Sequence, residues 1–199
     1  MILLKPNILF LVLDALPARK CYENSSEIKI PNIKKLMKEG VVFKQAISSG
    51  DETMVSFASM FTAKFPFKGA IRPSLWTYKY RDNSNNYIKI LKKNDYQTYA
   101  TLPKLTAWKE IFSDFEIDYY LSHNERLYNG LGDKILKKIN EKKMNKPWFY
   151  LLHLLDSHKP INYPNEFDTN EFGVDEYERM MSYVDTWIGK FLEKIDLKN

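Results

Sequence analysis

Two continuous apolar runs of strand length constrain the fold of this chain more than any other feature. The first is residues 7–14, NILFLVLD, and the second is residues 147–155, PWFYLLHLL. Runs that are apolar at every position are typical of parallel strands covered by helices on both faces of a sheet. In such sheets ligands bind beyond the carboxyl ends of the strands. We therefore predict that the first run is a central strand and that Asp14 lies at the ligand-binding edge of the sheet.

Shorter strand patterns and amphipathic helix patterns alternate through the rest of the chain. The further predicted strands are residues 41–47, 96–102 and 117–121, and residues 66–83 are predicted to be a loop. The predicted helices are residues 32–38, 53–61, 85–93, 106–112, 125–144 and 174–195. This alternation predicts a doubly wound α/β fold, with a mostly parallel sheet and helices on both faces. A length of 199 residues suits one such domain, so residues 1–199 are treated as a single unit.

Composition narrows the classes of partner. The net charge of +5 comes from lysines spread along the chain, which favours an anionic substrate and argues against a nucleic-acid partner. Cys21 is the only cysteine, so the sequence predicts neither a disulfide framework nor a cysteine metal site. No run approaches the about 18 apolar residues of a membrane span, and Asp14 interrupts the N-terminal run that would otherwise imitate a secretory signal. These features predict a cytoplasmic protein without a transmembrane segment.

Three polar residues follow or open elements at one edge of the predicted sheet: Asp14, Thr53 and His158. A carboxylate at the end of a buried strand is costly unless it is paired or bound to a metal ion; a solvated or helix-capping Asp14 is the alternative. Thr53 stands at a helix N-terminus, where N–H groups and partial positive charge suit a phosphate or sulfate ester; a plain N-cap is the alternative. His158 follows the second apolar run, as a substrate contact or proton donor, or as an ordinary loop histidine.

The other two histidines carry weaker signals. His153 lies inside the second apolar run, so we predict a buried core histidine, with a supporting role behind the site as the alternative. His123 lies in a polar loop and predicts nothing.

Six segments match one family pattern in order and spacing. They are residues 6–16 (PNILFLVLDAL), 30–48 (IPNIKKLMKEGVVFKQAIS), 53–63 (TMVSFASMFTA), 87–100 (YIKILKKNDYQTYA), 147–164 (PWFYLLHLLDSHKPINYP) and 177–195 (YERMMSYVDTWIGKFLEKI). Together they resemble the N-terminal half of the sulfatase family, within the alkaline phosphatase superfamily. The resemblance implies a divalent metal ion held by Asp14 and Thr53, with Thr53 as nucleophile and His158 in contact with the substrate. It leaves the metal open among Mn, Zn, Ca and Mg.

The nucleophile position departs from the sulfatases themselves. Thr53 stands where they have a cysteine that is converted to formylglycine, and the arginine that would support it is absent. Ala15 stands where many of them have a second aspartate. The chain therefore resembles the members of the superfamily that act on phosphate esters and use a serine or threonine hydroxyl.

The end of the chain leaves two functions open. The family continues into a strand and a Ser-Asp-His-Gly-like motif that completes the metal site, whereas this chain stops at Asn199, so we expect the domain to be C-terminally incomplete. Asp14 and Thr53 are fewer ligands than such metals usually have. One hypothesis is a metal-dependent hydrolase or transferase of phosphate or sulfate esters, completed by self-association or by another chain. The other is a catalytically inactive sulfatase-like fragment or binding module.

Overall fold

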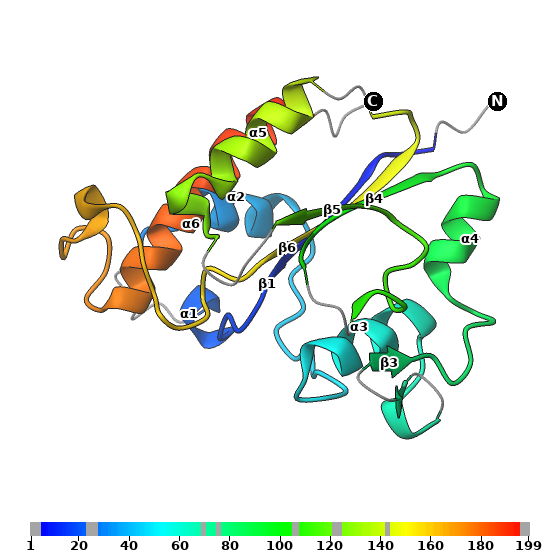
Figure 1. Cartoon of the computed structure of the whole chain (residues 1–199). Helices are drawn as coiled ribbons and strands as arrows, with labels where there is room; N and C mark the ends of the chain where they lie inside the picture. Colours follow the sequence, from blue (N-terminus) through cyan, green and yellow to red (C-terminus); the bar gives the residue numbers. More distant parts are fainter. Residues whose placement is uncertain are drawn as a thin grey trace.

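The computed structural model describes residues 5–22, 28–68, 71–74, 77–104, 108–120, 125–141 and 144–195, and its main feature is a four-stranded sheet. The strands lie in the order β1-β6-β4-β5, and every pairing between them is parallel. Their bounds are β1 (Ile8–Leu13), β4 (Gln97–Pro103), β5 (Glu116–Tyr120) and β6 (Trp148–Leu154). The two long apolar runs of the sequence are therefore neighbours, β1 beside β6 (Figure 1).

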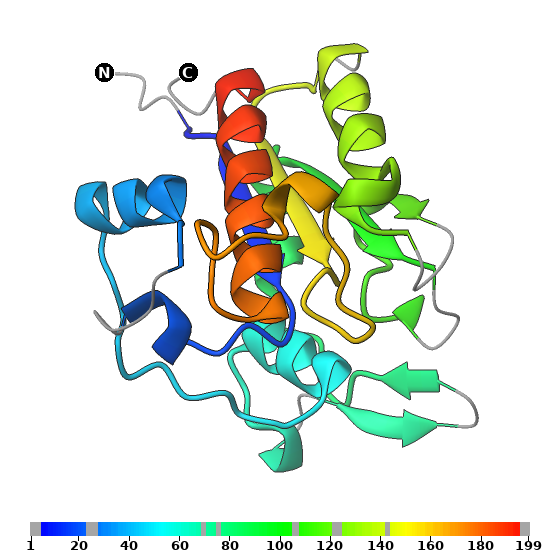
Figure 2. The same cartoon turned by 90° about the vertical axis from the view of Figure 1, so that its left-hand side faces the viewer.

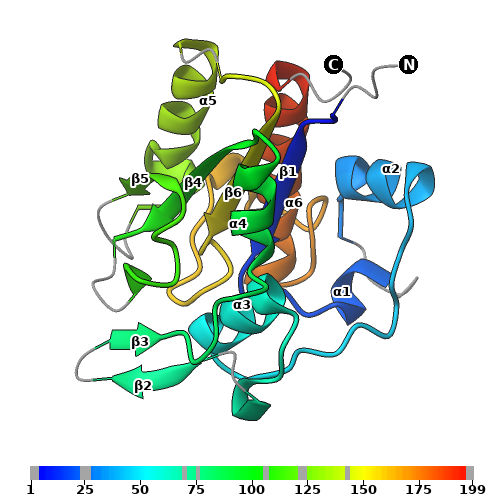
Figure 3. The same cartoon turned by 90° about the vertical axis from the view of Figure 1, so that its right-hand side faces the viewer.

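Helices cover both faces of this sheet, which confirms the predicted doubly wound architecture (Figures 1 and 3). One layer contains α2 (Pro31–Glu39), α5 (Leu131–Glu141) and α6 (Glu176–Lys194). The other contains α3 (Thr53–Thr62) and α4 (Tyr87–Lys93). The short elements are α1 (Arg19–Tyr22), the hairpin of β2 (Arg72–Ser74) and β3 (Thr77–Lys79), and the 3-10 turns η1 (Pro66–Lys68), η3 (Leu127–Asn129) and η4 (Asn165–Phe167).

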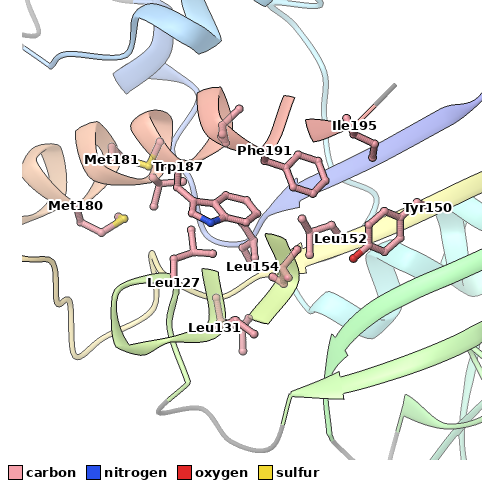
Figure 4. Close-up of a cluster of buried hydrophobic side chains, with 14 of the residues drawn as sticks. Leu127, Leu131, Tyr150, Leu152, Leu154, Met180, Met181, Trp187, Phe191 and Ile195 are labelled. Carbon is pink, nitrogen blue, oxygen red and sulfur yellow. The ribbon is translucent and has the colours of Figure 1, made fainter. Parts of the chain in front are cut away.

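A separate hydrophobic core lies on each side of the sheet. Under α5 and α6, side chains such as Trp187 and Phe191 pack on Leu152 and Leu154 of β6 (Figure 4). On the opposite side the core is aromatic, and Phe57 of α3 meets Phe112 edge to face with ring centroids 5.1 Å apart. Burial of each such side chain contributes roughly 1.5–3 kcal/mol, so the two cores fix the sheet between its helix layers.

The docking of α2 on α6 explains a motif near the end of the chain. Asp185 is fully buried, and its carboxylate accepts hydrogen bonds from the backbone N–H groups of Asn32 at 3.1 Å and Ile33 at 2.7 Å. These are free donors at the start of α2, so Asp185 caps that helix from a distance. One turn later, a Cβ on Gly189 would lie 2.7 Å from the Asn32 side chain. The two helices are therefore too close at this point for any residue larger than glycine.

Four expectations about elements are wrong. β1 is the edge strand of the described sheet rather than a central one, and its six residues are half-buried. Residues 41–47 form no strand, and Val41, Phe43 and Ile47 are 82%, 74% and 92% exposed. The predicted loop 66–83 contains η1 and the β2–β3 hairpin.

The helix boundaries show the fourth difference. The helix predicted over 125–144 begins as the turn η3, and α5 starts only at Leu131. Of the helix predicted over 106–112, residues 108–112 form turns and residues 106 and 107 lie outside the described residues. His123 also lies outside them.

Candidate functional site

The site is organised around the carboxylate of Asp14, which directly follows β1. Its Oδ2 atom accepts a hydrogen bond from Thr53 Oγ1 at 3.1 Å. The same oxygen lies 2.9 Å from His153 Nε2 and 3.4 Å from His158 Nε2. The structure thus brings together the three residues predicted from strand ends and a helix start, and it adds His153.

The sheet explains why these residues meet. The backbone N–H of Asp14 donates to Leu154 O at 3.0 Å, so the parallel ladder continues past the end of β1. In the β1–β6 register Val12 is opposite His153, which places the histidine two positions before Asp14 and on the same face of the sheet. The loop after β6 then returns His158 to the same edge, as expected where parallel strands end together.

Thr53 is not a plain helix cap. Glu52 occupies the N-cap position of α3, and Thr53 is the first helical residue. Its hydroxyl donates to Asp14 instead of accepting from its own helix. The alternative interpretation of Thr53 as an N-cap is therefore wrong, and the side chain stands at a helix N-terminus that offers unpaired N–H groups to an anion.

His153 has a larger part in the site than the sequence indicates. Its side chain is fully buried, with ring centroids 5.2 Å from Phe57 and 5.4 Å from Trp108. That surrounding agrees with the predicted core histidine, yet Nε2 contacts Asp14 directly. An apolar run gives no sign of such a contact, because it depends on which strands are neighbours.

The electrostatics favour an ionised carboxylate. Burial alone raises the pKa of Asp14, but the hydrogen bonds and charge of His153, the hydrogen bond of Thr53 and the charge of His158 outweigh it and lower the pKa to about 2. The side chains of Asp14 and His158 are 19% and 45% exposed, so solvent reaches the site. Asp14 is therefore a negative group at neutral pH that a cation can approach.

The donor set fits a divalent cation only in part. A carboxylate and a hydroxyl 3.1 Å apart are oxygen ligands of the kind that hard cations take. Within the described ranges, however, no group of three or more His, Cys, Asp and Glu side chains is arranged to hold a metal ion. Asp14 and Thr53 would hold such an ion, and a complete coordination shell needs ligands from outside these residues.

None of the helices in the described part of the chain is both long enough and apolar enough to cross a membrane.

Solved structures share the fold at low sequence identity. The C-terminal periplasmic domain of EcEptC from Escherichia coli has a TM-score of 0.66 at 15% identity, over 96% of this chain and 60% of that one. An alkaline phosphatase superfamily protein from Vibrio parahaemolyticus has a TM-score of 0.61 at 20% identity, over 96% and 50%. The lipoteichoic acid synthase LtaP from Listeria monocytogenes has a TM-score of 0.56 at 19% identity, over 95% and 52%. The chain thus spans 50–60% of the length of these proteins.

Sequence comparison gives the family. No curated protein sequence matches the chain. The family model named Sulfatase matches residues 6–199, which is nearly the whole chain and includes Asp14, Thr53 and His158. The chain belongs to the sulfatase family.

Proposed function

We propose that this chain carries the nucleophile half of a metal-dependent hydrolase or transferase that acts on phosphate or sulfate esters. The observation that supports this most is the hydrogen bond from Thr53 Oγ1 to Asp14 Oδ2 at the N-terminus of α3. It joins a hydroxyl, an ionised carboxylate and an anion-binding helix start at one place.

In the proposed reaction the residues of the site have different roles. The first N–H groups of α3 bind the anionic ester, and Asp14 orients the Thr53 hydroxyl. Thr53 Oγ1 attacks the phosphorus or sulfur atom while its proton passes to Asp14 Oδ2, so an ester bond to Thr53 forms as the bond to the leaving group breaks. Water or an acceptor hydroxyl then displaces Thr53 Oγ1 and releases the group. His158, at the exposed rim, binds a substrate oxygen or protonates the leaving oxygen. A divalent cation held by Asp14 and Thr53 would lower the pKa of the hydroxyl and neutralise charge on the ester.

Several observations bear on the ester class. Structural neighbours include a phosphoethanolamine transferase from Campylobacter jejuni and BT4656 in complex with D-glucosamine-2-N,6-O-disulfate, so both classes occur on this fold. One neighbour from E. coli was solved as a complex with Zn. A threonine cannot become formylglycine, so Thr53 supports phosphate esters as the substrate class. We propose that a second copy of this chain supplies the remaining metal ligands, so that the purified chain can assemble the site.

A non-catalytic role is the second candidate. It is favoured by the shortage of metal ligands among the described residues. In that case the chain binds an anionic ester at the start of α3 without turning it over.

The test measures metal binding and turnover together. Calorimetry with Mn, Zn, Ca and Mg is paired with hydrolysis of bis-p-nitrophenyl phosphate and p-nitrophenyl sulfate. We expect metal-dependent turnover of the phosphodiester, which Thr53→Ala lowers by roughly 10³-fold or more and Thr53→Ser largely keeps. Circular dichroism checks that the variants remain folded. Turnover retained in Thr53→Ala would remove Thr53 from the nucleophile role.

A second variant, Asp14→Asn, tests metal binding. Asp14→Asn removes the charge but keeps the shape, so we expect at least about tenfold weaker metal binding with a much smaller change in folding stability. Unchanged affinity would place the metal elsewhere. Metal binding without any turnover in the wild-type chain would support the non-catalytic role.

A further inference from the structure

The backbone directly after Asp14 makes an unusual turn. Ala15 has a φ of 57°, in the left-handed region that residues with a Cβ rarely adopt. Such a conformation costs on the order of 1 kcal/mol or more and persists only where neighbouring groups enforce it. Ala15 is itself exposed, so its own side chain is not what holds the turn.

Two hydroxyl groups donate hydrogen bonds to the backbone carbonyls of this turn. The Ser157 hydroxyl donates to Asp14 O, and the Tyr177 hydroxyl donates to Ala15 O at 3.1 Å. Burial raises the pKa of Tyr177 to about 12, so this hydroxyl keeps its proton and remains a donor at neutral pH.

Both hydroxyls come from firmly anchored backbone. Ser157 is buried in the loop between β6 and His158. Tyr177 is the second residue of α6, whose first turn is capped by Asp175 through the Glu178 N–H at 2.8 Å. Lys20 of α1 reaches the buried carboxylate of Glu178 at 2.6 Å, so the segment after the turn is tied to the same end of α6 (Figure 2).

We propose that Tyr177 and Ser157 are positioning residues for the site: they fix the Asp14–Ala15 turn so that the Asp14 carboxylate meets Thr53, His153 and His158. A site of this kind works only when its groups are held within about 0.5 Å of their productive places. Among the described strands, β1 has a ladder on one side only, so the turn that follows Asp14 gains its second support from these hydroxyls. The proposal rests on the proposed function in one respect, namely that Asp14 holds a cation.

The test compares Tyr177→Phe and Ser157→Ala with a matched control. Tyr163→Phe removes a tyrosine hydroxyl that donates to Asp168 at 3.2 Å, away from Asp14. The first readout is the dissociation constant of Mn²⁺ beside the melting temperature. The second is the ¹⁵N spectrum of the imidazoles in the metal-free chain, where His153 and His158 report on Asp14.

We expect Tyr177→Phe to weaken Mn²⁺ binding by about tenfold, as the loss of groups that orient metal ligands commonly does. We expect the His153 and His158 signals to move, and the melting temperature to change no more than in Tyr163→Phe. The double variant should weaken binding by less than the product of the two single effects, because both residues act on one turn.

The opposite results separate this proposal from the proposed function. Unmoved imidazole signals in Tyr177→Phe would overturn the positioning role, whether or not metal binding changes. A wild-type chain that binds no Mn²⁺ would count against the proposed function, while the imidazole signals would still decide the role of Tyr177 and Ser157.

Discussion

Asp156 is a buried carboxylate whose surroundings disfavour its negative charge. Its side chain is buried, and Oδ1 accepts from the Leu127 N–H at 2.9 Å, while Oδ2 has no hydrogen-bond partner within the part of the chain that the structure describes. Burial raises its pKa to about 6, and the Leu127 hydrogen bond and the charge of Arg126 oppose this only in part. The negative charge of Asp156 therefore costs stability at neutral pH.

That cost predicts a pH dependence of a definite sign. The folded chain keeps the proton of Asp156 up to a pH of about 6, whereas the unfolded chain loses it near 3.8. Stability consequently falls as the pH rises from about 4 to about 6. Asp156→Asn cannot titrate, so its stability relative to wild type should rise across this interval, by about 3 kcal/mol, and then level off. Urea unfolding of both proteins at several pH values measures the difference; a constant difference would contradict the raised pKa.

At the residue scale the sequence located three residues of the candidate site but not all of the contacts between them. Asp14, Thr53 and His158 could be singled out because each stands where a strand ends or a helix begins, and parallel strands end at one edge. His153 could only be placed inside an apolar run, where the simplest interpretation was a core residue. Its contact with Asp14 follows from β1 and β6 being neighbours, and local sequence does not encode which strands pair.

At the scale of the elements, the packing of α2 against α6 depends on two residues of α6, Asp185 and Gly189. Asp185→Ala leaves the first N–H groups of α2 without their acceptor, so we expect a loss of about 2 kcal/mol or more in unfolding free energy. Gly189→Ala would press a methyl group into the Asn32 side chain and cost about 1–3 kcal/mol.

Lys190→Ala, on the exposed side of the same helix, is the control and should change stability by less than about 0.5 kcal/mol. Urea titrations measure all three, and a Gly189→Ala variant as stable as the control would mean that the helices can separate freely.

Element types with their own periodicity were predictable, and elements that need a partner were not. The helical patterns that became α3, α4 and α6 were recognised because one face of each is apolar along its length. Residues 41–47 have the apolar and β-branched residues of a strand, yet they form no strand in the described chain, and Val41, Phe43 and Ile47 stay exposed. Strand propensity is a preference for a half-buried pleated surface, and it forms a strand only where a neighbour supplies that surface.

At the scale of the whole molecule, the outer edge of β1 is apolar on both faces but lacks a neighbouring strand among those described. Both faces of β1 are covered, with Leu9, Leu11 and Leu13 on one core and Ile8, Phe10 and Val12 on the other. Only β6 pairs with β1 among the described strands. Because the Asp14 N–H bonds to β6, the alternation of a parallel ladder directs the N–H groups of the odd-numbered residues of β1 to the open side.

This open edge predicts self-association of the isolated chain. A flat apolar strand with unpaired backbone groups is a template for another strand. Sedimentation velocity should show a mass that rises with protein concentration, and the amides of Leu9, Leu11 and Leu13 should exchange hydrogen more slowly in the associated state. A single monomeric species at every concentration, with fast exchange at these positions, would contradict the prediction.

The direction of α6 also decides how the protein can be handled. The helix starts beside the Asp14 turn, where Tyr177 contacts Ala15, and runs back along the sheet to Ile195 (Figure 1). Lys5 precedes β1 and Asp14 follows it, so Lys5 lies at the end of the sheet opposite the candidate site. A dye joined at position 195 would therefore sit about one helix length, roughly 28 Å, from the Asp14 turn. A chain tethered to a sensor chip through position 195 would present Asp14, Thr53 and His158 to the flowing solution.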